Sequence, residues 1–519
     1  MTMNYEEAAE KIINEAIKSA VFIDENALEP YSPNTQNTQG EAERSVALYT
    51  EFKESGVSLS IFKYSNDNYD KYKNYLFENR DLVLLDWKLE GDDHDGEKSL
   101  DLLSEIVNNQ QHIHFCVIYT NEDKNHALSN ILSFFSNTTR SEYEEIRLNI
   151  SEIEEDVTKI LPVINELSLS RFKPSAKELF KSIRKNNFDT TNSILQIVEG
   201  DNPMCSLIKC GVALSNGIKS SEKQPCPSSI DSDSHTLCIN NTIITILNKK
   251  EIAPSTLLKT FEKSITTYKW GIMRLIGLEF HNIQKKKCSF IDGSILNVTK
   301  EALGYHKSMK KDEFDAFLKD VMLEQESLNL RNEKLFLVDV IEDKPYDDNL
   351  QNEYVLMNVF YNAVQLNYDR PLTFGDVFMQ NDSYYLCITA LCDCIRPQKR
   401  GNKFYFVKGK KMKTADALET GDAGFVSFLN EEECVRWNTS QNKDNVPTYI
   451  IPENYLVPNS VIKGGKLTVL GWKEENGNWN PCSNELTYIT TLKQNYTQRI
   501  ANHAFSHPVR VGIDYVKKN

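Results

Sequence analysis

The feature that most constrains this chain is a short apolar run, Leu82–Leu85, which ends in a single acid, Asp86. A loop containing Gly91 and Gly96 follows, and a helical pattern begins at Glu97. A short apolar run bounded by turn signals predicts a strand that is buried on both faces of a parallel sheet. Open α/β sheets bind their ligands at the carboxyl ends of such strands, so Asp86 is a candidate site residue.

Two neighbouring runs end in a similar way. Ala20–Ile23 is followed by Asp24 and Glu25, and Phe115–Tyr119 is followed by Thr120. An acid pair, a single acid and a hydroxyl would then meet at one edge of one sheet. Clustered carboxylates suit a hard divalent cation such as Mg²⁺. A carboxylate beside that cation can act as a nucleophile toward a phosphoryl group, and the hydroxyl could hydrogen-bond to the new phosphoryl oxygens.

With these residues in this order, residues 18–168 resemble a response-regulator receiver domain. The resemblance rests on the acid pair, on Asp86 within Asp-x-x-Leu-x-Gly…Asp-Gly, and on Thr120. It implies that Asp86 is the phosphoacceptor and Thr120 the switch hydroxyl. It also implies that Asp24, Glu25 and Asp86 hold Mg²⁺, and that a histidine-kinase-type ATPase donates the phosphoryl group.

The chain departs from the family pattern at three places. Glu90 stands where the family has proline, and two extra residues precede the Asp95–Gly96 pair. The family's fifth strand ends in a lysine, whereas the candidate here, Glu145–Ile150, is followed by Ser151 and offers only Arg147 nearby. A receiver fold kept for docking, without phosphorylation, therefore stays open beside a working receiver.

The length of 519 residues predicts two to four domains. We expect a receiver-like domain at 1–170, with a doubly wound parallel sheet of five strands. A mostly helical region at 171–345 would follow, with an exposed linker near 220–235 and helices at Leu237–Leu247 and Ser255–Gln284. Residues 346–519 predict a β-rich barrel or sandwich that closes on a helix at Leu486–Phe505.

Composition narrows the classes of function. The eleven cysteines form no CxxC pair, which indicates reduced thiols and a cytoplasmic protein. The N-terminus lacks the pattern of a signal peptide, and no apolar run reaches membrane-spanning length. Residues 1–170 carry 33 Asp and Glu against 14 Lys and Arg, a net charge of −19 in a chain of −15. This acidic part is either a solvated surface or a domain that docks on a basic patch of the rest.

The whole-chain pI near 5.3 argues against nucleic-acid binding along the entire chain, although a local basic patch stays open. A homodimer is a further possible assembly of this chain.

One further constellation lies in the β-rich part. Gly375–Asp376 predicts the entry to a barrel strand, and Cys392–Asp393–Cys394 follows the next strand. Cys392 with Asp393 could form a thiol nucleophile or half of a metal site. A nucleophilic thiol needs a base, and only His503 or His507 could serve, whereas buried cysteines often act simply as small apolar residues.

Three hypotheses follow for function. The first is a regulatory protein whose receiver-like domain accepts a phosphoryl group or binds a partner and switches an output region. The second is a phosphorylation-independent scaffold in a multiprotein prokaryotic stress or phage-defence system. The third is a thiol- or metal-dependent enzyme in the β-rich half, for which no complete catalytic set can be named.

Overall fold

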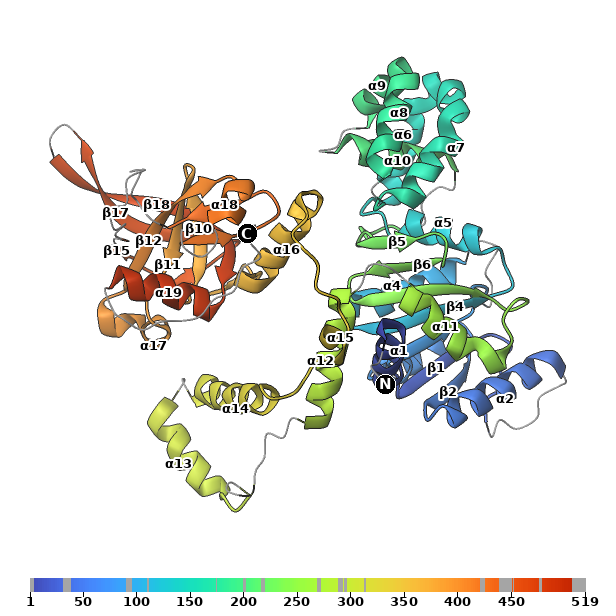
Figure 1. Ribbon diagram of the computed structural model, residues 1–519, viewed down its shortest axis with the longest axis horizontal. Helices are drawn as coiled ribbons and strands as arrows, with labels where there is room; N and C mark the ends of the chain where they lie inside the picture. Colours follow the sequence, from blue (N-terminus) through green and yellow to red (C-terminus); the bar gives the residue numbers. More distant parts are fainter. Residues whose placement is uncertain are drawn as a thin grey trace. The chain divides into compact units, whose positions relative to one another are not determined.

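The computed structural model divides into two compact units. The first comprises residues 1–305 and 316–342, and the second comprises residues 306–315 and 343–519 (Figure 1). The structure describes residues 4–30, 39–89, 96–109, 112–173, 175–198, 202–215, 220–267, 272–287, 293, 296–311, 314–420, 425–437, 450, 452–475 and 478–505.

A seven-stranded sheet forms the centre of the first unit. Its first five strands are parallel, in the order β2-β1-β3-β4-β7, and β6 and β5 add antiparallel strands beyond β7. The parallel strands are β1 (Ser19–Asp24), β2 (Ser58–Lys63), β3 (Leu82–Leu85), β4 (His114–Thr120) and β7 (Thr242–Asn248). The predicted doubly wound parallel sheet of five strands is confirmed, and two antiparallel strands extend it.

Helices cover both faces of this sheet, which explains the continuous apolar runs of its strands. Alternate residues face opposite sides, so that Leu84 joins one apolar core and Leu85 the other. The first core takes side chains from α1 (Tyr5–Ala16), α2 (Gln39–Glu54), α11 (Leu257–Thr267) and α12 (Ile272–Lys287). The second takes them from α3 (Tyr69–Phe77), α4 (Glu97–Asn109) and α5 (Lys124–Phe134).

Five helices are inserted between α5 and the last three strands, and they share an apolar core of their own (Figure 1). They are α6 (Arg140–Ile150), α7 (Glu154–Ser170), α8 (Ala176–Asn186), α9 (Phe188–Ile197) and α10 (Pro203–Ser215). The prediction that Glu145–Ile150 is the fifth strand was therefore wrong. Thr139 caps the start of α6 and forms a capping box with Glu142, and this local signal fixes a helix there.

The fifth parallel strand lies a hundred residues later, in a segment predicted as helix. Instead of a helix at Leu237–Leu247, the chain forms a hairpin of β6 (Thr236–Ile239) and β7. Asn240 opens the two-residue turn with a φ of 50°, a left-handed conformation that asparagine tolerates. The β-branched content of β7 and this Asn-Asn turn are strand signals that outweigh the helical spacing.

The predicted exposed linker at 220–235 was also wrong. It contains β5 (Ser229–Asp231), and Ser220 and Gln224 within it are buried. Gln224 accepts a hydrogen bond from Ser104 of α4 at 2.9 Å, which ties the segment to the sheet's helical cover.

The middle of the chain is mostly helical, as predicted. The helix predicted at Ser255–Gln284 is two helices, α11 and α12, and residues 268–271 between them lie outside the described part of the chain. Further along are α13 (Lys300–Lys310), α14 (Phe314–Leu330) and α15 (Phe336–Asp339). The predicted domain boundaries at 170 and 345 stay predictions; the sheet itself takes three strands from residues beyond 170.

The second unit is built on a closed antiparallel barrel of six strands, which confirms the β-rich prediction. The ring runs β11-β10-β18-β17-β15-β12, and β12 pairs with β11 to close it. The strands are β10 (Asp376–Gln380), β11 (Ser383–Cys387), β12 (Lys403–Met412), β15 (Pro452–Leu456), β17 (Lys466–Glu475) and β18 (Asn478–Leu492).

Short elements surround this barrel. The strands are β8 (Ala363–Val364), β9 (Arg370–Pro371), β13 (Val426–Phe428), β14 (Cys434–Arg436) and β16 (Val461–Ile462). The helices are α16 (Gln351–Asn362), α17 (Leu391–Ile395), α18 (Thr414–Thr420) and α19 (Gln494–Ala504). The closing helix was predicted to start at Leu486, but β18 occupies the chain as far as Leu492 and the helix starts at Gln494. Among the described residues, no helix combines the length and the apolar character that crossing a membrane requires.

Candidate functional site

The carboxyl edge of the parallel sheet brings together two acids and one lysine. Asp24 is the last residue of β1, Asp86 directly follows β3, and Lys249 directly follows β7. The Lys249 Nζ lies 2.8 Å from Asp24 Oδ2 and 2.9 Å from Asp86 Oδ2. One ammonium group therefore bridges two carboxylates that come from adjacent strands.

Lys249 was missed because the family's lysine was expected after Glu145–Ile150, which is part of a helix and not the fifth strand. The residue reaches the acid edge because β7 pairs in parallel with β4, and its backbone N–H donates to the Thr120 carbonyl at 2.7 Å. Its side chain is only 2% exposed. The sequence signal that could have located it is the β-branched run Thr242–Asn248, which ends directly before this lysine.

Backbone and hydroxyl contacts hold Asp86 in place. The Trp87 N–H donates to Asp86 Oδ1 at 2.9 Å, while the Asp86 N–H donates to the Ile23 carbonyl of β1 at 3.0 Å. From the first turn of α4, the Ser99 hydroxyl donates to the Asp86 carbonyl at 2.7 Å. One side-chain oxygen is thus committed to the backbone and the other to Lys249. Residues 90–95, which include Glu90, Gly91 and Asp95 of the motif, lie outside the described residues.

The two other predicted site residues lie at the same edge with different surroundings. Thr120 ends β4 and is buried, and its Oγ1 accepts a hydrogen bond from the Glu122 N–H at 3.0 Å. Glu25 follows Asp24 and is half-buried, and it accepts a hydrogen bond from the Asn26 side chain at 3.2 Å. The sheet therefore places Thr120 beside the backbone of Lys249, while Glu25 stands at the more open side.

Burial sets the electrostatics of this edge. It raises the pKa of Asp86 to about 7; the charge of Lys249 opposes this rise and the neighbouring Asp24 adds to it. Burial by itself would lower the pKa of Lys249, but Asp86 and Asp24 outweigh burial and raise it. The lysine therefore stays charged, and a single positive charge faces two acids. With both carboxylates ionised, the edge lacks one positive charge.

The chemistry of these groups fits Mg²⁺. Asp24, Glu25 and Asp86 supply the carboxylate oxygens that this cation prefers, and the missing positive charge gives a reason for it to bind. Asp24 Oδ1 also accepts the Asn26 N–H at 2.7 Å, so the acid is held in a fixed orientation. Within the described ranges no group of three or more His, Cys, Asp or Glu side chains is placed so that it could hold a metal ion.

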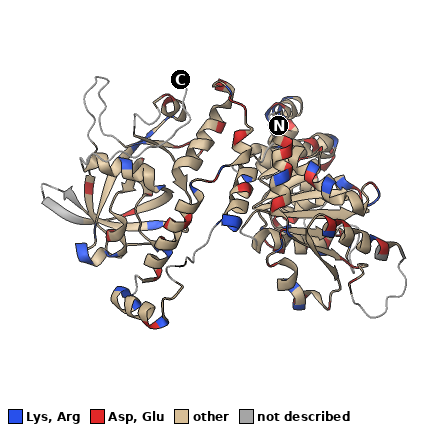
Figure 2. Ribbon diagram, turned by 60° about the horizontal axis from the view of Figure 1, so that its bottom comes forward, with Lys and Arg blue, Asp and Glu red and all other residues tan. Residues whose placement is uncertain are grey.

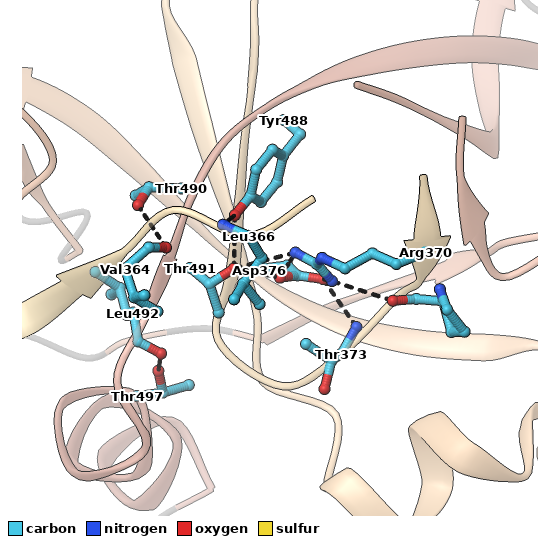
Figure 3. A network of polar contacts seen from close by, with 11 residues as sticks. Val364, Leu366, Arg370, Thr373, Asp376, Tyr488, Thr490, Thr491, Leu492 and Thr497 are labelled. Carbon is cyan, nitrogen blue, oxygen red and sulfur yellow. Dashed lines mark hydrogen bonds and ion pairs between the residues drawn. The ribbon is translucent and has the colours of Figure 1, made fainter. Parts of the chain in front are cut away.

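The Gly375–Asp376 pair in the barrel has a structural role. Asp376 begins β10, as predicted for a strand entry, and it is fully buried. Figure 3 shows Arg370 facing it; Arg370 Nη1 and Nη2 lie 2.9 and 2.6 Å from its two carboxylate oxygens. The Thr491 hydroxyl of β18 donates to the same carboxylate at 2.8 Å. The acid is saturated with donors, and the network joins β9, β10 and β18.

The cysteine segment that follows is not assembled into a site. Cys392 is exposed on α17, and Asp393 pairs with Arg400 at 3.1 Å instead of contacting a thiol. Cys394 is buried, and its thiol donates to the Thr389 carbonyl at 3.3 Å. The His503 ring packs on Phe425 with centroids 4.5 Å apart, and His507 lies outside the described residues. The structure thus gives Cys392 no base among the residues it describes.

The fold and this edge together define a class of protein domain. The five parallel strands have the order 2-1-3-4-5 when they are counted along the chain, with β7 as the fifth. Acids at the carboxyl ends of the first and third strands, a hydroxyl at the end of the fourth and a lysine after the fifth define a receiver-like domain. In agreement, residues 16–166 match the family model of the response receiver domain. No curated protein and no solved structure matches the chain. The N-terminal part is a receiver-like domain, which points to signalling or regulation.

Proposed function

We propose that this chain is a cytoplasmic signalling protein whose receiver-like domain accepts a phosphoryl group on Asp86 and thereby switches the output region. The observation that carries the proposal is the bridge from Lys249 to Asp24 and Asp86. A buried lysine at this position supplies the positive charge that a phosphoryl group on Asp86 would need. Mg²⁺, when bound, adds the charge that lets both acids ionise together.

The transfer itself requires one bond to form and one to break. A carboxylate oxygen of Asp86 attacks the phosphorus of the donor, and the bond from phosphorus to the donor's leaving group breaks. The leaving group, an imidazole nitrogen of a histidine-kinase-type ATPase or the carboxylate of a small acyl phosphate, keeps the electron pair. Lys249 can then move from the Asp86 carboxylate to a phosphoryl oxygen while it keeps its contact with Asp24. Thr120, whose backbone carbonyl accepts a hydrogen bond from the Lys249 N–H, carries the hydroxyl that can then hydrogen-bond to a phosphoryl oxygen.

The experiment is phosphate transfer to the full chain. A fragment ending at residue 170 would lack β7 and Lys249, so the full chain is the correct reagent. We expect incubation with acetyl phosphate and Mg²⁺ to add the mass of one phosphoryl group, and Asp86→Asn to abolish the gain. Asp70→Asn, which alters an exposed acid, is the matched control. Beryllofluoride should change the fluorescence of the buried Trp87, which adjoins Asp86.

A phosphorylation-independent scaffold is the second candidate, and one observation favours it. Lys249 occupies both acids and the Asp86 side chain is only 13% exposed, so the edge is already a closed ion-pair cluster. On this alternative the domain docks a protein partner, as part of a multiprotein prokaryotic stress or phage-defence system. Absence of any mass gain, together with a partner recovered equally by the wild type and Asp86→Asn, would replace the first proposal with this one.

A further inference from the structure

We propose that a cavity in the helical insertion binds a nucleotide that carries at least two phosphate groups. The cavity has a volume of about 630 Å³ and lies between α8 and the first residues of α9 and α10. Its lining combines four basic side chains with three apolar ones and one amide: Lys177, Lys181, Arg184, Lys185, Phe180, Phe188, Met204 and Asn202. A volume of this size falls in the range of sites for small organic ligands and cofactors.

The basic residues of the cavity come from one helix. Lys177, Lys181 and Lys185 follow one another at intervals of four residues on α8, and Arg184 lies three residues after Lys181, a spacing that places them along one side of the helix. From Lys177 to Lys185 the helix rises by about 12 Å. Like charges at this spacing repel and make the isolated helix less stable. An anion bound beside this row would relieve the repulsion.

No acidic side chain in the described part of the protein pairs with these basic residues. All four basic side chains are exposed, and none of them forms an ion pair or a side-chain hydrogen bond with another described residue. The acid of the same helix, Glu178, is absent from the cavity lining. This contrasts with the neighbouring helix α7, where Lys159 pairs with Asp156 at 2.7 Å. Among the described residues, the lining of the cavity therefore carries four positive charges and no acid.

The apolar part of the lining narrows the class of ligand. Phe188 is 59% exposed at the start of α9, and Phe180 and Met204 extend the apolar surface into the cavity. A bare phosphate or sulfate ion would leave this surface in contact with water. Exposed aromatic rings beside Lys and Arg are the combination on which nucleic-acid bases stack while their phosphates meet the cations. A planar base with two or more phosphates uses both parts of the cavity.

Charge and size favour a short ligand over a long strand. The first 170 residues of the same unit carry a net charge of −19, which repels an extended polyanion. Four cations along about 12 Å match a few phosphates and no more. Free nucleotides and short single strands share this chemistry, and the experiment separates the two sources.

The test titrates the full chain with two labelled probes, adenosine triphosphate and a four-residue oligouridylate, by fluorescence anisotropy. The buffer contains low salt and EDTA, so that no divalent cation carries phosphates to the acid edge of the sheet. We expect saturable binding of at least one probe. The probe that binds more tightly shows whether the ligand is a free nucleotide or a short single strand. For the oligouridylate, affinity should fall as salt rises, with a slope set by the phosphates that are neutralised.

Two variants locate the binding in this cavity. Phe188→Ala should weaken binding by roughly 5- to 100-fold through lost stacking, and its exposure makes the change harmless to folding. Lys181→Gln should weaken binding and reduce the salt slope for the oligonucleotide by about 0.7. Ser182→Glu is the matched control, since it also lowers the net charge by one on α8 but alters a residue outside the cavity lining.

Other outcomes overturn the proposal. It fails if the full chain binds neither probe, or if Phe188→Ala and Lys181→Gln bind as the wild type does. It also fails if a polyglutamate peptide of equal charge binds as tightly as the nucleotides, because the surface would then be a general acceptor of acidic partners. None of these results bears on phosphate transfer to Asp86, which is measured separately.

Discussion

At the scale of single residues, Lys249 controls the charge balance of the acid edge. It is the one described residue whose ammonium contacts both Asp24 and Asp86, and all three side chains are largely withdrawn from water. Removing one member of a buried ion-pair cluster leaves the others uncompensated, which is costlier than losing an exposed pair. The cluster is therefore a stability element as well as a candidate phosphorylation site.

We expect Lys249→Met to destabilise the first unit by about 3 to 5 kcal/mol, because two buried carboxylates would lose their shared cation. Urea unfolding followed by tryptophan fluorescence measures the change. Lys250→Met, which alters the exposed residue next to Lys249, should leave the urea concentration at the midpoint of unfolding unchanged. The double variant Lys249→Met/Asp86→Asn should recover part of the loss. A single variant as stable as the wild type would show that the bridge is weak in solution.

The raised pKa of Asp86 gives a prediction about pH. The folded protein holds this proton more tightly than the unfolded chain, whose value lies near 3.8. Asp86 therefore contributes stability at low pH that is lost as the pH rises through about 7. In EDTA, the free energy of unfolding of Asp86→Asn relative to that of the wild type should rise by on the order of 1 kcal/mol or more between pH 5.5 and pH 8. A difference that stays constant over this pH range would contradict the raised pKa.

At the scale of elements, local backbone signals decided two segments whose type was predicted wrongly from their apolar residues. The Asn240–Asn241 turn makes a hairpin of β6 and β7, whereas the capping box at Thr139 makes a helix of the segment predicted as a strand. In each case a local backbone signal agreed with the tertiary structure, and a run of apolar residues was ambiguous.

The barrel contains a comparable backbone constraint at Gly375. This glycine has a φ of 95°, and an added Cβ would overlap the Leu492 carbonyl oxygen at the end of β18. We expect Gly375→Ala to destabilise the second unit by about 2 kcal/mol or more. Gly464→Ala, which also has a positive φ but open space around its Cα, should cost less. Thermal unfolding of the two variants compares them, and equal losses would assign the effect to φ alone.

At the scale of the whole molecule, the receiver-like sheet is discontinuous in sequence. Its parallel strands come from residues 19–120 and 242–248, and five inserted helices lie between them. Figure 2 shows acidic and basic residues interspersed over both units, so the negative excess of the first part is not confined to one element. The inserted helices belong to the same compact unit as the sheet.

This discontinuity predicts how truncated chains behave. A fragment of residues 1–170 lacks β5, β6 and β7 and would expose the buried side of β4, an edge that favours aggregation. We expect this fragment to be largely unfolded or aggregated, and a fragment of residues 1–342 to fold. Circular dichroism and size-exclusion chromatography distinguish the two results. A monomeric, cooperatively unfolding 1–170 fragment would show that the last three strands are dispensable.

The sequence alone determined the strands that end in Asp24, Asp86 and Thr120, and the class of the N-terminal domain. It could do so because buried parallel strands are short apolar runs that leave a plain local signal. It also indicated the barrel, through short β-branched and aromatic strands separated by turns.

Only the tertiary structure decided that Lys249 completes the acid edge and that α8 lines a basic cavity. The contact of Lys249 with Asp86 depends on strand order and joins residues more than 150 positions apart in the sequence. The cavity beside α8 depends on how the inserted helices pack. No local sequence pattern records either kind of contact. Parallel pairing of β7 with β4 brings the lysine to the acids, because the carboxyl ends of parallel strands meet at one edge.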